Sequence, residues 1–228
     1  MAPKVLVILT SHSEMGNTGK PTGWYLPELA HPYEVLTASG AELTIVSPKG
    51  GDAPLDPNSV EMFKSDPVAS SFLANKKSLW QNTAKLSTYL GRADEFDAVF
   101  VPGGHGPMFD LATDKDSQKL VAEFAKKGKV VSAVCHGPAA FVNVKMEDGK
   151  HLLEGKKVTG FSNDEEEQVG LSKVVPYSLE DELRKNAGGY EKAGEPWGVK
   201  VVVDGKLITG QNPASSKAVG EAILKSIS

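Results

Sequence analysis

The stretch Val130-Val131-Ser132-Ala133-Val134-Cys135-His136-Gly137-Pro138 places a thiol where an apolar strand ends. Cys135 is the single cysteine among 228 residues. A strand-to-helix turn that projects one side chain outward crowds the positions two before and two after it. Ala133 and Gly137 occupy those positions, and both are small. A lone cysteine is more often a buried small hydrophobe, but these neighbours favour a nucleophile.

Short apolar runs on both sides of this turn predict a mostly parallel sheet. Nearly continuous apolar runs, typical of strands covered on both faces, lie at 4–10, 43–47, 97–101 and 129–134. Helical spacing is found at 24–39, which ends at a predicted left-handed cap, Gly40, and at 114–127 and 215–227. Further predictions are a short strand at 157–161, a mainly polar helical stretch at 163–188, and a hairpin at 199–209 around Asp204-Gly205.

The alternation of strands and helices predicts an α/β doubly wound sheet sandwiched by helices, with a hairpin near the C-terminus. We expect a single domain, 1–228, because no stretch rich in Pro, Gly or Ser divides the chain. Residues from about 50 to 90 form a predicted cap or insert made of an irregular loop and short helical pieces.

Composition restricts the classes of partner. The chain carries 25 basic and 29 acidic residues, a formal charge of −4, with no long block of either sign. This balance argues against nucleic acid and membrane surfaces and favours a small, neutral or polar substrate. One cysteine forms no internal disulfide, and no signal-peptide pattern or membrane-spanning apolar run is present. We therefore expect a cytoplasmic protein whose thiol stays reduced.

A glycine-rich turn supplies a complementary part of the predicted site. Gly103-Gly104-His105-Gly106 follows the strand at 97–101, and ligands of open α/β sheets bind at the carboxyl ends of such strands. Backbone N–H groups of Gly104 or His105, together with that of His136, are predicted to hold an oxyanion. His136 is also the nearest candidate base for the thiol.

Motifs for other chemistry fail on spacing. The glycines of Gly16-Asn17-Thr18-Gly19-Lys20 are too close together for a phosphate-binding loop. Phe109 occupies the position of the third glycine in a dinucleotide fingerprint. The histidines show no paired ligand spacing; they are His12, His31, His105, His136 and His151, the last predicted at the surface. We expect neither cofactor nor metal.

Two acidic regions are candidates for proton transfer. Glu28 lies near the start of the helix at 24–39 among apolar neighbours, where burial would raise its pKa toward neutrality. The run Asp164-Glu165-Glu166-Glu167 is typical of a solvated helix start. The residues alone do not select one member of this run.

Taken together, four motifs resemble the DJ-1/PfpI superfamily, and within it the fungal heat-shock protein 31 branch of glutathione-independent glyoxalase III enzymes. They are Ala133 to Pro138, Gly103 to Gly106, the segment Gly23 to Pro32 with Glu28 and His31-Pro32, and Gly210-Gln211-Asn212-Pro213-Ala214-Ser215. The resemblance runs almost the whole length and includes Ala53-Pro54-Leu55-Asp56-Pro57.

This resemblance implies a flavodoxin-like sandwich, a homodimer and a site of Cys135, His136 and an acid. Glu28 matches the family's acid close to sulfur, and Glu166 matches its third triad member, with Asp164, Glu165 and Glu167 as alternatives.

The implied activity is a cofactor-independent glyoxalase III, a lyase also described as D-lactate dehydratase. It would convert methylglyoxal, a 2-oxoaldehyde, into lactate through a hemithioacetal on Cys135. Alternatives are a stress-induced holdase that binds unfolded proteins, a cysteine peptidase or amide hydrolase, a protein deglycase, and a redox sensor oxidised at Cys135. The cytoplasm, and also the nucleus, is the expected location.

Overall fold

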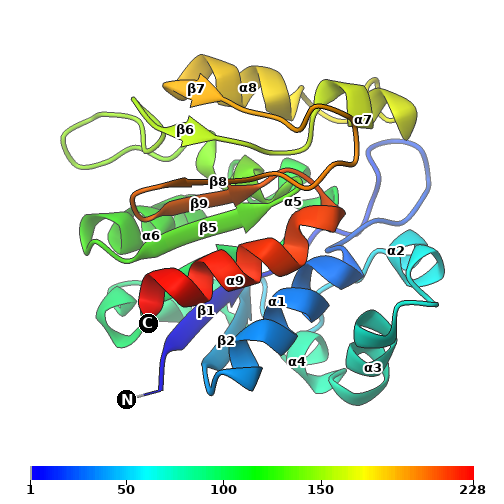
Figure 1. Ribbon diagram of the computed structural model, residues 1–228, viewed down its shortest axis with the longest axis horizontal. Coiled ribbons are helices and arrows are strands. Elements are labelled where there is room, and N and C mark those ends of the chain that lie inside the picture. The colour runs from blue at the N-terminus through cyan, green and yellow to red at the C-terminus, as the bar shows by residue number, and fades with distance from the viewer. Residues whose placement is uncertain (1) are drawn as a thin grey trace.

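A seven-stranded sheet forms the centre of the computed structural model, which describes residues 2–228 (Figure 1). The strand order is β3-β2-β1-β4-β5-β9-β8, and neighbours are parallel except in the β8–β9 hairpin. The strands are β1 (Lys4–Ile8), β2 (Glu42–Ser47), β3 (Ala84–Lys85), β4 (Ala98–Val101), β5 (Val130–Val134), β8 (Val201–Asp204) and β9 (Leu207–Gly210). The predicted doubly wound, mostly parallel sheet with a C-terminal hairpin is confirmed.

The apolar runs of the sequence occupy the middle of this sheet. Every residue of β4 and β5 is buried, as expected for strands covered on both faces. The two strands are neighbours, with Val101 opposite Ala133. The glycine turn after β4 and the thiol after β5 therefore lie side by side at the carboxyl ends of these strands, as predicted from the sequence.

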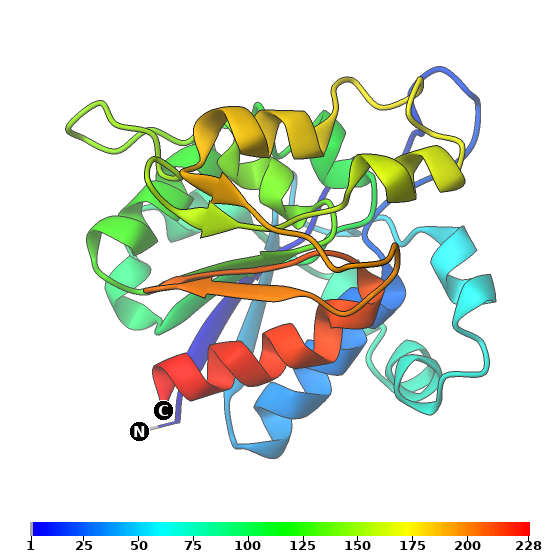
Figure 2. The same cartoon turned by 45° about the horizontal axis from the view of Figure 1, so that its top comes forward.

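Helices cover both faces of the sheet (Figures 1 and 2). On one face α1 (Leu26–Ala38) and α9 (Ser216–Ile227) pack against each other, and on the other α6 (Lys115–Lys126) packs against β4 and β5. Gly40, beyond the end of α1, has the predicted left-handed conformation, with φ of 82°. Shorter helical turns begin at strand ends: α5 (Gly106–Phe109), η3 (Gly137–Phe141) and η4 (Pro213–Ser215). Among residues 2–228, no helix combines the length and apolar character needed to cross a membrane.

The predicted insert contains short helices, and it also contributes a strand that the sequence did not indicate. Its elements are α2 (Pro57–Met62), α3 (Pro67–Asn75), α4 (Ser78–Gln81), β3 and η1 (Leu86–Tyr89), and η2 (Ala93–Glu95) follows it. β3 pairs with β2 and forms one edge of the sheet; its two residues are too few to show a strand pattern. Trp24, just before α1, packs against Trp80 and Phe72 of the insert, with ring centroids 5.4 and 6.5 Å away.

The predicted strand at 157–161 does not join the main sheet. β6 (Lys157–Val158) instead pairs with β7 (Gly189–Tyr190) in a separate two-stranded sheet, at the top of Figure 1. The N–H of Lys157 in β6 donates to the side chain of Asp204 in β8 and not to a backbone oxygen of that strand, so β6 does not extend the main sheet. The polar stretch at 163–188 forms α7 (Asn163–Gln168) and α8 (Leu179–Asn186), joined by a loop.

The turn after β5 depends on a glycine. A Cβ at Gly137 would lie 2.1 Å from the backbone oxygen of Val101 in β4 and 3.2 Å from the Cβ of Ala133. A backbone oxygen of a central strand has little freedom to move aside.

We expect Gly137→Ala to lower the free energy of unfolding by roughly 2–3 kcal/mol, because the added methyl group overpacks a rigid contact. Denaturant unfolding would measure this loss. The control is Gly194→Ala, where no atom lies within 4 Å of the added Cβ. Equal stability of the two variants would contradict this account of the turn.

Candidate active site

Cys135 occupies the sharp turn between β5 and η3. Its φ is 60°, in the left-handed region that non-glycine residues adopt under strain. Its N–H donates to the carbonyl oxygen of Gly210 at 3.0 Å, and its carbonyl oxygen accepts from the N–H of Phe161 at 2.9 Å. These two bonds hold the strained residue in place, with its thiol at the carboxyl end of the sheet.

Glu28 lies in the first turn of α1 and is fully buried. The N–H of Gly103 donates to its Oε2 at 2.7 Å. Its Oε1 is also buried and lacks a conventional hydrogen bond within residues 2–228. Burial raises the pKa of Glu28 to about 8, although interactions with the Cys135 thiol and the Gly103 N–H lower it in part. The carboxyl group is therefore mainly neutral at pH 7.

Cys135 and Glu28 form a buried pair of acids. Burial and the charge of Glu28 raise the pKa of the Cys135 thiol, whereas the N–H of Gly104 favours the thiolate. Neighbouring acids of this kind titrate as a pair. When Glu28 is neutral its repulsion disappears, and its O–H can donate to a sulfur that has lost its proton. Both groups are therefore mainly protonated at neutral pH, and when the thiol gives up its proton the pair keeps the proton on Glu28.

His136 connects the thiol to a carboxylate. Its Nδ1 lies 3.4 Å from the Cys135 sulfur, and its Nε2 lies 2.6 Å from Oε2 of Glu166. His105 approaches the other oxygen of Glu166, with Nε2 to Oε1 at 2.7 Å. A carboxylate accepts hydrogen bonds, so both Nε2 atoms carry a proton. The free lone pair of His136 Nδ1 then faces the sulfur.

The protonation states around His136 suit a base. Burial lowers the pKa of His136, and the nearby His105 lowers it further, against the opposing effect of Glu166. Burial would raise the pKa of Glu166, but the charges and hydrogen bonds of the two histidines outweigh it and hold this pKa well below its usual value. At neutral pH, a neutral imidazole is thus anchored by an ionised carboxylate.

The structure distinguishes the four members of the acidic run. Glu166 alone of the four contacts His136. Asp164 pairs with Lys192 at the surface, 2.7 Å between Oδ2 and Nζ, and Glu167 accepts from the hydroxyl of Ser172. Glu166 is therefore the member of the run placed to support His136, and its role as third triad member stays a prediction.

Glu165 is buried but has a different setting. Its Oε1 accepts from the N–H of Trp197 and from the side-chain amides of Gln211 and Asn212, at 2.8 to 3.0 Å. Its Oε2 accepts from the N–H and hydroxyl of Ser162, both at 2.9 Å. Five donors fix this carboxylate. Glu165 thereby ties α7 to the loop that carries Trp197, a residue with φ of 65°.

These groups line a cavity of about 460 Å³. Its polar floor contains Cys135, His136 and Glu28, and Phe161 and Trp197 form an aromatic wall, with ring centroids 5.6 Å apart. The other lining residues are Met15, Lys20, Pro21, Tyr25, Asp56, Pro57, Asn58, Gly104, His105, Val169, Leu171 and Pro213. A larger hollow of about 960 Å³ lies beside α6, but no cysteine or histidine lines it.

The predicted oxyanion donors lie at this floor. The N–H of Gly104 interacts with the Cys135 sulfur, and that of His136 donates to no oxygen atom of residues 2–228. At Gly104, φ is 84° and a Cβ would lie 2.2 Å from the carbonyl oxygen of Gly23, so this position requires glycine. Both N–H groups are available to a substrate oxygen beside the sulfur.

Sequence reasoning missed three contributions to the cavity. It treated His105 only as a backbone donor, whereas the imidazole contacts Glu166. The sequence did not identify Tyr25, although it lies three residues before Glu28, or Trp197, which lies outside every motif. The sequence signal available for His105 was its place in the glycine turn, beside strand β5.

Histidine spacing also did not anticipate a group with metal-binding geometry. Ligand atoms of His105, His136 and Glu166 lie within 4.8 Å of one another. In the structure, hydrogen bonds join these atoms to each other. His151, predicted at the surface, is half-buried, because its Nε2 lies 2.9 Å from the carbonyl oxygen of Val142.

The raised pKa of Glu28 predicts a pH dependence of stability. Between the ordinary value of 4.5 and about 8, the folded protein holds a proton that the unfolded chain releases. The free energy of unfolding therefore falls as pH rises through this window. We expect denaturant unfolding at pH 5, 7 and 9 to show a fall on the order of a few kcal/mol that Glu28→Gln removes. The control Glu34→Gln, on the exposed face of α1, should keep the wild-type slope. An unchanged slope in Glu28→Gln would refute the assignment.

Comparison with known proteins places the chain in a family. The DJ-1/PfpI family matches residues 23–226. Glyoxalase 3 of Candida albicans is 34% identical over 234 residues, covering 97% of each chain. Glutathione-independent glyoxalase HSP31 of Saccharomyces cerevisiae is 34% identical over 225 residues, covering 95% of this chain and 94% of its own. The X-ray structure of Rapid Encystment Protein 24 kDa of Francisella tularensis has 40% identity and a TM-score of 0.93, covering 99% of both chains. The chain belongs to the DJ-1/PfpI family.

Proposed function

We propose that the protein is a glutathione-independent glyoxalase that converts methylglyoxal into lactate. The observation that carries this proposal is the 3.4 Å approach of His136 Nδ1 to the Cys135 sulfur, beside a neutral carboxyl group and inside a small cavity. The names of the two fungal relatives, which cover nearly the whole chain, support the same substrate class.

The first step is addition of sulfur to the aldehyde carbon, C1. His136 Nδ1 takes the thiol proton, and Glu166 stabilises the resulting imidazolium. The thiolate forms a bond to C1 while the C1–oxygen π bond breaks. The N–H groups of Gly104 and His136 hold the oxyanion. Return of the proton from His136 to this oxygen gives a neutral hemithioacetal.

The second step moves a proton between neighbouring carbons. His136, neutral again, removes the proton from C1, and the electron pair shifts toward C2 and its oxygen to give an enediolate. The Glu28 carboxyl group, which carries a proton at neutral pH, delivers it to C2 as the C1–C2 double bond breaks and the C1–oxygen double bond re-forms. The hydroxyl proton on C1 moves to the oxygen on C2. The result is a thioester with a hydroxyl on C2. C1 is oxidised and C2 is reduced, so no external electron carrier is needed.

The third step is hydrolysis of the thioester. His136 first passes the proton that it took from C1 to the ionised Glu28. It then takes a proton from water, whose oxygen forms a bond to C1 as the C1–sulfur bond breaks. His136 returns this proton to the Cys135 sulfur, and lactate leaves as its carboxyl proton passes to solvent. The net reaction adds one water molecule to methylglyoxal.

Other functions raised by the sequence remain proposals. The homodimer and the holdase rest on family resemblance. In an amide hydrolase or deglycase, the Cys135 thiol would attack a different carbonyl group. In a redox sensor, the thiol would be oxidised and would attack no carbonyl group. Lactate formation separates the glyoxalase from all of these.

Removal of the Cys135 thiol should abolish turnover, whereas removal of the Glu166 carboxylate that holds His136 should slow turnover. We expect Cys135→Ala to form lactate from methylglyoxal at the uncatalysed rate. Glu166→Gln should lose about 10²-fold or more in kcat, because it weakens the base and its imidazolium. The assay omits glutathione and measures lactate directly. The control is Glu167→Gln, at the surface of the same helix, which should keep wild-type activity. Wild-type turnover by Cys135→Ala would rule out the scheme.

A further inference from the structure

The proposed reaction develops charge at a position that the triad does not reach. In the proposed reaction the N–H groups of Gly104 and His136 hold the oxygen on C1, and the Gly104 N–H interacts with the sulfur itself. When the proton leaves C1, negative charge moves onto the oxygen of C2. A donor for that second oxygen has to come from another part of the cavity.

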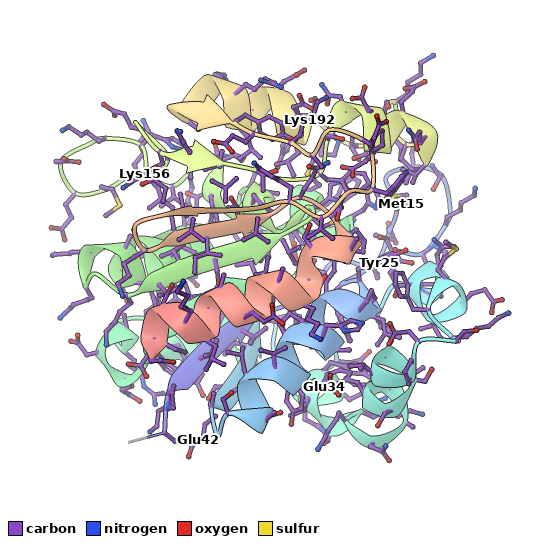
Figure 3. All side chains as sticks on the ribbon, viewed as in Figure 1. Met15, Tyr25, Glu34, Glu42, Lys156 and Lys192 are labelled. Atoms are coloured by element: carbon purple, nitrogen blue, oxygen red, sulfur yellow. The ribbon has the colours of Figure 1, made fainter. Side chains whose placement is uncertain are left out.

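Tyr25 lines the same cavity as Cys135 and Glu28. It is the residue immediately before α1, and its N–H donates to the carbonyl oxygen of Gly103 at 3.2 Å. Its ring packs edge-on against Phe63 of the insert, with ring centroids 5.9 Å apart and an angle of 84° between the planes. Figure 3 labels Tyr25 below Met15, which lines the cavity as well. Backbone and ring contacts together fix the side chain.

The hydroxyl of Tyr25 has no hydrogen-bond partner within residues 2–228, and it is not among the fully buried polar atoms. By contrast, Tyr190 of β7 donates to the carbonyl oxygen of Gly160 at 2.8 Å. Burial, followed by the charges of Glu28 and Cys135, raises the pKa of Tyr25. The phenol therefore keeps its proton, and the hydroxyl remains a donor for a ligand in the cavity.

The other polar side chains around the cavity suit this task less well. Asp56 is an acceptor that caps α2 through the N–H of Asn58 and receives the hydroxyl of Thr22. Lys20 and Asn58 are exposed. Tyr25 combines a fixed position, a retained proton and a free hydroxyl.

We propose that the hydroxyl of Tyr25 donates a hydrogen bond to the oxygen on C2 of the substrate, which makes Tyr25 a catalytic residue that selects carbonyl compounds with oxygen on both neighbouring carbons. The inference rests on the proposed glyoxalase activity. The interaction strengthens as the oxygen becomes enolate-like, so it lowers the barrier to removal of the C1 proton.

The test compares Tyr25→Phe with the wild type. Phenylalanine keeps the ring that packs on Phe63 and removes only the hydroxyl. The control is Tyr33→Phe, which removes a hydroxyl from α1 at a residue that packs on Phe72 and does not line the cavity. Lactate formation from methylglyoxal gives kcat and KM. The rate of Cys135 alkylation by iodoacetamide and the thermal midpoint report on the site and the fold.

We expect Tyr25→Phe to lose roughly 10- to 100-fold in kcat/KM, mainly in kcat, because the charge on the C2 oxygen is largest in the transition state. Its alkylation rate and thermal midpoint should match those of the wild type, and Tyr33→Phe should be unchanged in all three measurements. Activity of Tyr25→Phe within twofold of wild type would overturn the inference. A loss of activity accompanied by slower alkylation or a lower thermal midpoint would also overturn it, since the hydroxyl would then organise the site. Absence of lactate from the wild type would instead overturn the proposed function on which the inference rests.

Discussion

The proton that the buried Glu28 carboxyl group retains beside the Cys135 thiol governs this site. Glu28 is fully buried beside the thiol of Cys135, and the N–H of Gly103 holds one of its oxygens. Two negative charges there would repel each other at short range without water to screen them. A proton must therefore stay with the pair. A substrate beside both groups can then be attacked by the Cys135 sulfur and receive a proton from Glu28. The site can therefore act at neutral pH although burial disfavours a free thiolate.

The fold forms this pair by bringing the ends of two strands close to the start of a helix. β4 and β5 are neighbours, so the turns that follow them place Gly103, Gly104 and Cys135 together at the carboxyl ends of the strands. α1, on one face of the sheet, directs Glu28 toward these residues. The layer built from β6, α7 and α8 adds Glu166, which holds His136. Glu165, one residue earlier, is held by five donors and fixes the loop of Trp197. Adjacent residues of one short helix thus serve the base and the cavity wall.

The local sequence pattern was enough to predict the sheet, the sharp turn at Cys135 and the burial of Glu28. Continuous apolar runs identify central strands, and the small residues around Cys135 identify a turn that cannot hold larger ones. The sequence pattern did not predict the contacts that depend on tertiary packing. β6 pairs with the distant β7 and not with a strand of the main sheet, and the side chain of His105 reaches Glu166 only after β4 and α7 come together. The acidic run looked solvated, yet two of its members are buried.

The proton held by Glu28 can be observed directly. Carbon-13 NMR of the glutamate side-chain carboxyl groups, with the Glu28 signal assigned by its loss in Glu28→Gln, gives the titration of this residue in the folded protein. The account predicts a midpoint near 8, well above the ordinary value of 4.5. A midpoint near 4.5 would mean that Glu28 is ionised beside the thiol at neutral pH, and it would contradict the retained proton on which the proposed chemistry depends.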